Sequence, residues 1–360
     1  LKGSLVNKRL SCRFHILNLL LLLCLLPLSA MAGESSLVVT APAGQTSLTM
    51  TFMGDCILGS EEKSRKLPES FDTAIQDEGY AWPFSGVAHI LQADDLSVIN
   101  LEGVFKDDRA GREDGKLHWF RGPTDFAQIL PHSSIELAGL ANNHVRDYGN
   151  AGRRTTKKAL EDNGIPYFGY SDLHVWEKDG LKIGFGGIRE TTFRQKPKLP
   201  AEEIQQLKEQ GCHYIVYTIH AGKEYDNNHN KLQTRMAHDI IDAGANLVVG
   251  AHPHVVQGIE QYNDGLIIYS LGNFVFGGNL KLTEFEAFML QVHLDFAGEA
   301  LRETTLTLIP VFTTGARPAN DFRPIPAEGE DKARILKRIQ DDSGDLTITE
   351  VMRFPAAPAE

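Results

Sequence analysis

Five short apolar runs of this sequence end in acidic, amide or imidazole side chains. These side chains are Asp55, Asn100 with Glu102, Asn142-Asn143-His144 with Asp147 close behind, His220 with Glu224 close behind, and His252 with His254. Such a mixture of oxygen and nitrogen ligands suits a first-row divalent cation such as Mn²⁺, Fe²⁺ or Zn²⁺ better than Ca²⁺, which prefers oxygen alone. If the five run ends meet in space, the sequence predicts a site for one or two such ions.

The segment His252-Pro253-His254 is the strongest single signal. In extended backbone, residues i and i+2 face the same side, so both imidazoles would point at one ion, and imidazole is the commonest transition-metal ligand. The other segments are weaker alone, because Asp after Gly is usually a turn residue and Glu is mostly a solvated surface residue. Asn142-Asn143 is as compatible with a turn in left-handed conformations as with a functional site. Four of the 13 histidines lie directly at run ends, which favours the metal interpretation when the segments are taken together.

The apolar runs have the length and the bounding residues of β-strands. Strands are expected at Leu48–Met53, Leu96–Leu101, Ile135–Leu140, Leu181–Phe185, Tyr214–Ile219, Asn246–Val249, Leu266–Leu271, Ala287–Leu294 and Leu301–Leu308. Helices are expected at Phe84–Leu91, Arg153–Asp162, Ala201–Gln210, His229–Ala243 and Asp331–Gln340. Their alternation predicts a layered α/β protein, and the consecutive strands near the C-terminus indicate a mixed sheet. Ligands gather at the carboxyl ends of strands in such sheets, which is where the polar residues fall.

Several segments are expected to be flexible. They are the Ser35–Ser47 stretch, the charged loop Lys106–Lys116, the stretch Thr313–Glu330 and the tail from Pro355. The Lys106–Lys116 loop closely follows Glu102, so it either shapes the entrance of the predicted site or is a solvated loop without a role. None of the internal stretches marks a clear domain boundary, and a single domain is expected.

The first 32 residues have the layout of a secretory signal peptide. Four basic residues precede an apolar run of about 15 residues, and Ala30-Met31-Ala32 supplies a cleavage site. The alternative is an uncleaved membrane anchor, although a spanning helix needs ~20 apolar residues. Both interpretations place the remaining chain on the far side of the inner membrane, in the periplasm or elsewhere outside the cytoplasm.

Removal of this leader makes the protein strongly acidic. The formal net charge of −11 becomes −15 when four positive charges leave, which argues against nucleic acid as a partner. An anionic substrate is still compatible with this charge, because bound metal ions supply local positive charge. Only Cys56 and Cys212 lie outside the leader, so one disulfide at most can form. Cys56 is interpreted as a small buried strand residue.

The order of the motifs resembles the CapA family, bacterial capsule-synthesis proteins associated with poly-γ-glutamate. The motifs are Met53-Gly54-Asp55, Asn100-Leu101-Glu102, Ala141-Asn142-Asn143-His144 with Asp147-Tyr148-Gly149, His220-Ala221-Gly222-Lys223-Glu224, Gly250-Ala251-His252-Pro253-His254-Val255 with Gln257, and Ser270-Leu271-Gly272-Asn273-Phe274. The resemblance implies one domain over residues 48–345, after a signal peptide (1–32) and a flexible linker (33–47) and before a C-terminal strand and tail (346–360). It also implies an α/β (α+β) fold like that of the calcineurin-type metallophosphoesterases, a four-layer αββα sandwich of two mixed sheets.

The resemblance also assigns roles to the site residues. The implied metal ligands are Asp55 and His254 for a first ion, Glu102 as the bridging carboxylate, and Asn143, His220 and His252 for a second ion. His144 is similar to the histidine that contacts phosphate and protonates the leaving alcohol, and Asp147 would orient its ring. With two ions bound, water would be activated for in-line attack on phosphorus.

The sequence departs from the phosphoesterase pattern at two positions. Ile57 stands where those enzymes have a metal-binding histidine, and Glu102 replaces an aspartate. The first ion is therefore short of a ligand, for which Glu224 is a candidate substitute. Asn273 would line the floor of the cleft, or simply form the turn that ends a strand.

The implied function is capsule, poly-γ-glutamate or cell-surface polymer biosynthesis outside the cytoplasm, with a metal-dependent phosphoesterase-like site. Two alternatives stay open, namely a general metallophosphoesterase of the cell envelope and a non-catalytic polymer-binding or scaffold subunit of a membrane synthase. Ile57, which cannot bind metal, favours the non-catalytic alternative more strongly than the number of matching motifs alone would. The expected partners are membrane-bound polymer synthase subunits and an anionic polymer or phosphoester substrate.

Overall fold

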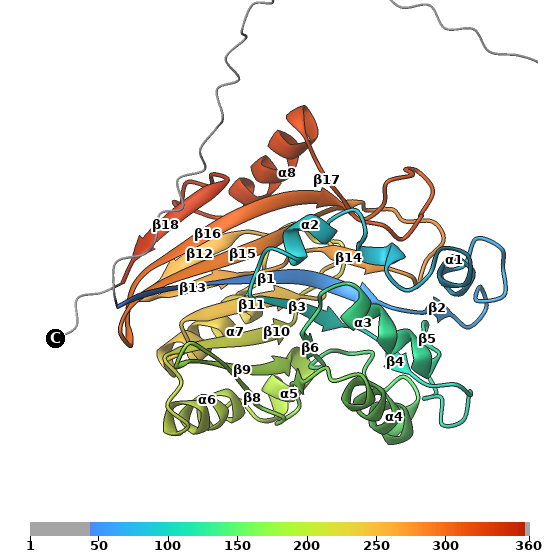
Figure 1. Cartoon of the computed structure of the whole chain (residues 1–360), viewed down its shortest axis with the longest axis horizontal. Coiled ribbons are helices and arrows are strands. Elements are labelled where there is room, and N and C mark those ends of the chain that lie inside the picture. The colour runs from blue at the N-terminus through green and yellow to red at the C-terminus, as the bar shows by residue number, and fades with distance from the viewer. Residues whose placement is uncertain (1–43, 357–360) are drawn as a thin grey trace, which may run out of the picture. The chain divides into compact units, whose positions relative to one another are not determined.

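Two mixed β-sheets pack face to face between outer layers of helices (Figure 1). This computed structural model describes residues 44–356, so the expected signal peptide and nearly all of the expected linker lie outside the described residues. Within residues 44–356, no helix is both long and apolar enough to cross a membrane. The expected α/β fold of two mixed sheets in four layers is confirmed.

The first sheet has nine strands. Their order is β17 (Ile325–Pro326), β16 (Ala300–Phe312), β15 (Glu286–Ala297), β1 (Gln45–Ile57), β3 (Leu96–Leu101), β6 (Leu137–Gly139) and β7 (Tyr167–Phe168), with β14 (Asn273–Phe276) beside β1 and β18 (Val351–Pro355) beside β16. The neighbours β1, β3, β6 and β7 are parallel, and β14 is parallel to β1. The pairs β1–β15, β15–β16, β16–β17 and β16–β18 are antiparallel.

The second sheet has six strands. Their order is β12 (Ile259–Tyr262), β13 (Gly265–Ile268), β11 (Leu247–Ala251), β10 (Tyr214–His220), β9 (Leu181–Arg189) and β8 (His174–Lys178). The four central strands are parallel and the two edge strands are antiparallel. A small third sheet consists of β2 (Ser60–Glu61), β5 (Phe120–Gly122) and β4 (Val104–Phe105).

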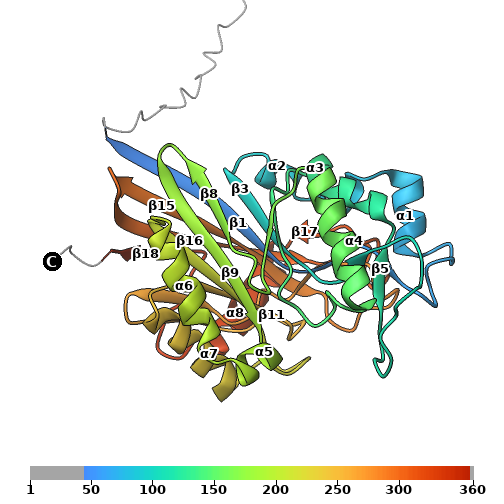
Figure 2. The same ribbon diagram turned by 90° about the horizontal axis from the view of Figure 1, so that it is seen from below.

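Helices cover the outer faces of both large sheets. Those that pack on the first sheet are α1 (Phe71–Glu78), η1 (Trp82–Phe84), α2 (Ala88–Leu91), η2 (Thr124–Gln128), α3 (Ile129–His132) and α4 (Gly149–Asp162). Those on the second sheet are α5 (Glu190–Gln195), α6 (Leu199–Glu209) and α7 (Lys231–Asp242), of which α6 and α7 are seen outside β9 in Figure 2. Helix α8 (Gly329–Asp341) packs against β15 and β16.

Strand alternation separates the core into layers. In β1, Leu48, Met50 and Phe52 face the second sheet, whereas Met53 contacts the cluster beneath the helices. Each of these side chains is at most 2% exposed, and full burial of such a side chain stabilises the fold by about 1.5–3 kcal/mol. The apolar layer between the sheets holds the strands in register, so their carboxyl ends are fixed relative to one another.

The structure differs from the expected elements in several places. The expected continuous helix 84–91 is wrong, because only its second half is α-helical, and Gly86 between the two parts packs against the Pro324 carbonyl oxygen, 2.2 Å from where a Cβ would lie. A 3₁₀ turn and the short α2 replace that helix. Strand β1 begins at Gln45, inside the expected linker. Strand β18 lies within residues 346–360, where a C-terminal strand is expected, and pairs with β16. The elements that were not expected are α1, η2, α3 and α5 and the strands β2, β4, β5, β7, β8, β12, β14 and β17. Cys56 and Cys212 are both free thiols.

Candidate metal centre

The two sheets bring the polar run ends together. From the first sheet come Asp55 in β1, Glu102 directly after β3, and the segment Asn142–His144 after β6. From the second sheet come His220, the last residue of β10, and the turn 252–254 after β11. Because β1, β3 and β6 are parallel, as are β10 and β11, these residues all lie at carboxyl ends of strands, as the sequence predicts.

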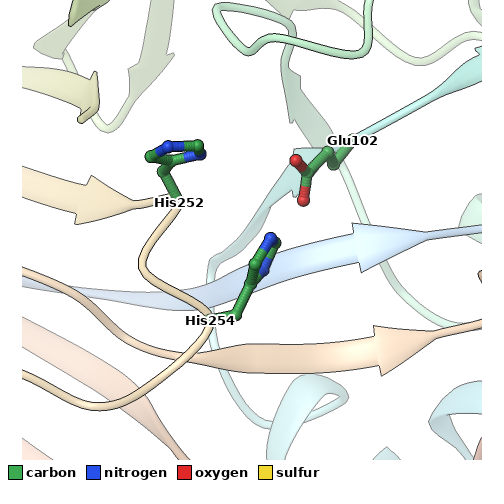
Figure 3. A group of neighbouring side chains, drawn as sticks. All are labelled: Glu102, His252 and His254. Carbon is green, nitrogen blue, oxygen red and sulfur yellow. The ribbon is translucent and has the colours of Figure 1, made fainter. Parts of the chain in front are cut away.

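Two groups of ligand atoms are close enough to hold a cation. One group is Glu102, His252 and His254, and the other is Asp55, Glu102 and His220. In each group the ligand atoms all lie within 4.8 Å of one another. Figure 3 shows the Glu102 carboxylate, at the end of β3, facing the His252 and His254 rings from the segment after β11. Glu102 belongs to both groups, which is the arrangement expected of a bridging carboxylate.

Asp55 is held in place by groups from both sheets. Its Oδ1 accepts a hydrogen bond from Asn100 Nδ2 at 2.6 Å, and its Oδ2 accepts one from the His252 backbone amide at 3.1 Å. His254 Nδ1 lies 3.2 Å from Oδ2. Burial raises the pKa of Asp55, but the hydrogen bond and charge of His254 outweigh this effect and lower the pKa to about 2. Asp55 is therefore ionised and held in position by groups of both sheets.

Glu102 contrasts with Asp55 because its charge is not compensated. The side chain is fully buried, and neither carboxylate oxygen has a hydrogen-bond partner among the described residues. His220 Nε2 lies 3.6 Å and His144 Nε2 lies 3.9 Å from Oε1 of Glu102. Burial and the charge of Asp55 raise the pKa of Glu102 well above its ordinary value. Ionising a buried carboxyl group that has no partner costs several kcal/mol, which is why the pKa of Glu102 is raised. A bound divalent cation would supply the missing partner for the ionised form, so the residues fit a metal ion.

His252 and His254 converge on the site by a route that differs from the expected one. Both residues have positive φ angles, 102° for His252 and 60° for His254, so the expectation of extended backbone is wrong. Two left-handed residues instead make a tight turn that places the ring centroids 6.0 Å apart. His252 Nδ1 is buried without a hydrogen-bond partner in the described part of the chain, which leaves it available to a ligand.

His254 is fixed by its neighbours. Its Nδ1 lies 2.8 Å from Asn273 Oδ1, at the first residue of β14. Burial lowers the pKa of His254, but the hydrogen bond to Asp55 and the charge of Glu102 raise it to about 9. Asn273 is thus a second residue that orients the imidazole, which supports the choice of this asparagine as a site residue.

His220 and Asn143 contact each other across the two sheets. His220 Nε2 lies 2.9 Å from Asn143 Oδ1, while Nδ1 lies 3.4 Å from Asn100 Nδ2. The rings of His220 and His252 are 4.6 Å apart between centroids. Burial, followed by the charge of His252, moves the pKa of His220 well below its ordinary value. The ring is therefore neutral, which is the form that binds a metal ion.

His144 forms a chain of contacts with Asp147 and Lys116. His144 Nδ1 lies 2.7 Å from Asp147 Oδ2, which also accepts a hydrogen bond from the Phe120 amide at 2.7 Å. Lys116 Nζ forms an ion pair with Asp147 Oδ1 and donates to the Asn143 carbonyl oxygen at 2.7 Å. Burial lowers the pKa of His144, and Asp147 opposes that effect. Asp147 thus holds Nδ1, and Nε2 is the ring nitrogen on the side of Glu102.

Two residues discussed in the sequence analysis lie outside the ligand groups. Glu224 is exposed and belongs to neither group, although its charge contributes to raising the pKa of His254. Ile57 is 1% exposed and packs with Phe120 and Phe276 in a small apolar cluster. That cluster flanks the site. The ring centroids of Phe120 and His144 are 4.4 Å apart, and those of Phe276 and His254 are 5.4 Å apart. An apolar wall therefore occupies the position of the expected histidine ligand.

The positioning roles of three residues, Asn100, Asn142 and Lys116, were not predicted from the sequence. Asn100 donates to Asp55, and Asn142 accepts from the His144 amide at 3.1 Å and donates to the Leu101 carbonyl at 2.8 Å. The strand-end pattern contained both asparagines, which was the available signal. Lys116 lies in the loop 106–116, which the sequence leaves open as either the entrance of the site or a solvated loop. Its contact with Asp147 depends on how the chain folds, so the sequence alone does not reveal it.

Fold and site together define an α/β protein of two stacked mixed sheets, with a buried cluster of carboxylate, amide and imidazole groups that could hold a metal ion at the strand ends. Residues 49–278 match the protein family described as "Bacterial capsule synthesis protein PGA_cap". The chain belongs to this family of bacterial capsule synthesis proteins, as its motifs indicated.

Comparison with individual proteins agrees with this assignment. The chain is 27% identical over 322 residues to the capsule biosynthesis protein CapA of Bacillus anthracis, covering 82% of this chain and 74% of that protein. It is 29% identical over 316 residues to the PGA biosynthesis protein CapA of Bacillus subtilis, covering 82% and 78%. Among solved structures, Vps29 of Chaetomium thermophilum is similar with 12% identity and a TM-score of 0.24, covering 73% of this chain and 96% of that one.

Proposed function

We propose that the cluster binds one or two divalent cations of the Mn²⁺, Fe²⁺ or Zn²⁺ type and hydrolyses a phosphoester during the biosynthesis of a capsule or cell-surface polymer. The observation that carries this proposal is the fully buried, unpaired Glu102 carboxylate facing His252 and His254. The ligands would be Asp55, Glu102, Asn143, His220, His252 and His254. A divalent cation supplies Lewis acidity there, which neutralises charge on phosphoryl oxygens and activates water.

The chain's own residues account for positioning and proton transfer. Asp147 accepts a hydrogen bond from His144 Nδ1–H, which directs Nε2 toward the site, and His144 in its imidazolium form would deliver the Nε2 proton to a leaving oxygen. Asn100 and the His252 amide fix the Asp55 carboxylate, and Asn273 fixes the His254 ring. The wall of Ile57, Phe120 and Phe276 excludes water from one side of the site. The groups are therefore positioned before a substrate enters, which is what this chemistry requires.

The first experiment measures metal content and turnover on the same protein. Purified protein is analysed for bound metal and assayed with a chromogenic phosphodiester and added Mn²⁺. We expect bound metal and turnover, with His144→Ala abolishing turnover and retaining metal. His252→Ala should lose metal, whereas His238→Ala should not, because His238 contacts Glu260 at 3.0 Å and lies outside the site. Equal loss of metal from both histidine variants would contradict the ligand assignment.

A second candidate function is a non-catalytic polymer-binding or scaffold role. It is favoured by Ile57, whose burial in the apolar cluster removes one expected ligand from the first ion position. Bound metal without turnover on any phosphoester would support this role. In either case we propose that the protein works outside the cytoplasm beside a membrane-bound polymer synthase, on an anionic polymer or phosphoester. A mature N-terminus near Gly33 in the periplasmic fraction would support that location.

A further inference from the structure

Two arginine side chains lie over the ring of Tyr170, which follows β7, and the charge of a third, Arg146, also acts on the tyrosine. The guanidinium carbons of Arg153 and Arg189 lie 5.1 and 5.7 Å from the ring centroid. Burial raises the pKa of Tyr170, and the positive charges of Arg189, Arg153 and Arg146 oppose that rise. The three guanidinium groups thus share one small region, which we call the arginine cluster (Arg146, Arg153 and Arg189).

The arginine cluster lies beside the candidate metal centre. Arg189 is the last residue of β9 and pairs in register with His220 on the neighbouring parallel strand. Phe185, four residues earlier in β9, belongs to the core between the sheets, so alternation puts Arg189 on that same inner face. The Tyr170 hydroxyl donates to the Asn142 carbonyl at 2.8 Å. The cluster therefore shares the strand-end edge with the metal-binding groups.

Too few acceptors surround these guanidinium groups. The Nε atom of each of the three arginines is buried and has no hydrogen-bond partner within residues 44–356. Arg153 is paired with Asp172 at 2.9 Å, and Arg146 lies 3.7 Å from Glu113. No carboxylate of the described chain lies within ion-pair distance of Arg189. Buried donors without acceptors cost free energy, and an oxyanion would provide the acceptors that the protein does not.

The charges of neighbouring side chains do not cancel the cluster. Asp172 is shared between Arg153 and Lys157, which lies 2.5 Å from it. Arg153 and Lys157 therefore share one carboxylate and Arg146 is paired with Glu113, which leaves Arg189 without an ion-pair partner among the described residues. This unpaired guanidinium group occurs in a protein whose formal net charge is −11. Positive charge concentrated beside a site in an acidic protein attracts anions to that site.

We propose that the arginine cluster is an oxyanion-binding subsite that holds a second anionic group, phosphate or carboxylate, of the molecule that enters the metal centre. Guanidinium groups bind both oxyanions through paired, charge-assisted hydrogen bonds. The link to a substrate rests on the proposed function, whereas binding of the anion does not. The subsite would select substrates with two anionic groups, one at each end of the shared edge.

The test measures anion binding in the presence of EDTA, so that the metal centre does not contribute. Isothermal titration calorimetry at low ionic strength uses two probes, inorganic phosphate and glutarate. We expect saturable binding of at least one probe, weakened about tenfold by Arg189→Gln, a change that corresponds to about 1.4 kcal/mol. Arg146→Gln should have a similar effect. Arg235→Gln is the matched control, because Arg235 is 65% exposed on α7 and faces Asp239.

Each outcome bears on the proposal. Preference for phosphate or for glutarate identifies the chemical group that the subsite takes, and equal binding shows a general oxyanion site. The proposal is overturned if neither probe binds with a dissociation constant below about 10 mM, or if Arg189→Gln binds as tightly as the unchanged protein. Arg146 is 43% exposed, so Arg146→Gln gives a second decision if Arg189→Gln does not fold. Failure of phosphoester hydrolysis leaves this result unaffected, because the measurement requires neither metal nor turnover.

Discussion

Replacement of Lys116 by methionine tests how the segment that carries His144 is held. Lys116 lies between β4 and β5, and its ammonium group contacts the Asp147 carboxylate and the Asn143 carbonyl oxygen. Asp147 is fully buried and also accepts hydrogen bonds from the His144 ring and the Phe120 amide. Methionine keeps the apolar stem of lysine and removes only the charge and its donors.

The expected cost follows from the burial of the two partners. Leaving one charge of a buried ion pair without its partner costs about 3–5 kcal/mol. The Lys116 side chain is 23% exposed, so water replaces part of the lost interaction, and two other donors to Asp147 remain. We therefore expect Lys116→Met to lower the free energy of unfolding by about 2 kcal/mol. The exposed pair Lys158–Asp162, with side chains 73% and 58% exposed, should contribute about 0.5 kcal/mol or less.

Urea unfolding measures both effects under the same conditions. The free energy of unfolding is compared for the unchanged protein, Lys116→Met and the matched control Lys158→Met. A double-mutant cycle with Asp147→Asn then isolates the pairwise term, for which we expect a coupling of about 1 kcal/mol or more. Equal losses in the two lysine variants, or additive effects in the cycle, would refute the view that Lys116 anchors the segment through Asp147.

Three further predictions concern Glu102, Asp94 and Gly250. Glu102→Gln should raise the free energy of unfolding in EDTA, because the folded state must either bind a proton at Glu102 or carry its charge unpaired. The variant should forfeit most of the gain of about 2.7 kcal/mol that Mn²⁺ at 100 times its dissociation constant gives the unchanged protein. A variant stabilised by Mn²⁺ as strongly as the unchanged protein would contradict the ligand role. Burial raises the pKa of Asp94 from 3.8 to about 6, so the folded state binds more protons than the unfolded state between these values, and the free energy of unfolding should fall as the pH rises from about 4 to about 6. Asp94→Asn should remove this decrease, giving a variant that is about 1–2 kcal/mol more stable at pH 7 after allowance for solvent screening, as measured by urea unfolding across pH. Gly250→Ala should lower the free energy of unfolding, measured by heat or urea, by about 3 kcal/mol, because the added Cβ would lie 2.0 Å from the Tyr269 carbonyl oxygen. The control Gly315→Ala should change it little, because the nearest atom to its Cβ would be a side-chain oxygen at 3.2 Å.

Much of the candidate site could be predicted because it depends on strand ends. The runs that became β1, β3, β6, β10 and β11 are short and apolar, and each is followed directly by polar residues. In parallel sheets such residues come to one edge whatever the details of the loops. Proximity of Asp55, Glu102 and His220 therefore needed only correct strands in two facing sheets, and those strands were evident from composition.

The arginine cluster was missed for a reason that the packing explains. The expected strand stopped at Phe185 because glycines follow it, yet β9 continues to Arg189. Those glycines lie in the strand because neighbours approach closely, since a Cβ on Gly187 would lie 2.3 Å from Thr218 Oγ1. From sequence alone, a glycine that ends a strand and one that accommodates a neighbour look the same. The left-handed turn at His252 and His254 was missed similarly, because only contacts across the sheets require it.

The distribution of satisfied and unsatisfied groups separates what holds the site from what awaits a ligand. Asp55, Asp147 and His254 each have partners supplied by the chain itself, so their positions do not depend on a bound ion. Among the described ligand candidates, only Glu102 and His252 have buried polar atoms without a partner. An apolar residue in place of a buried, uncompensated carboxylate is commonly neutral or stabilising, so folding alone gives no reason for a glutamate at position 102. The proposed cation gives such a reason, because a positioned cluster with two open groups could bind it without first having to order the ligands.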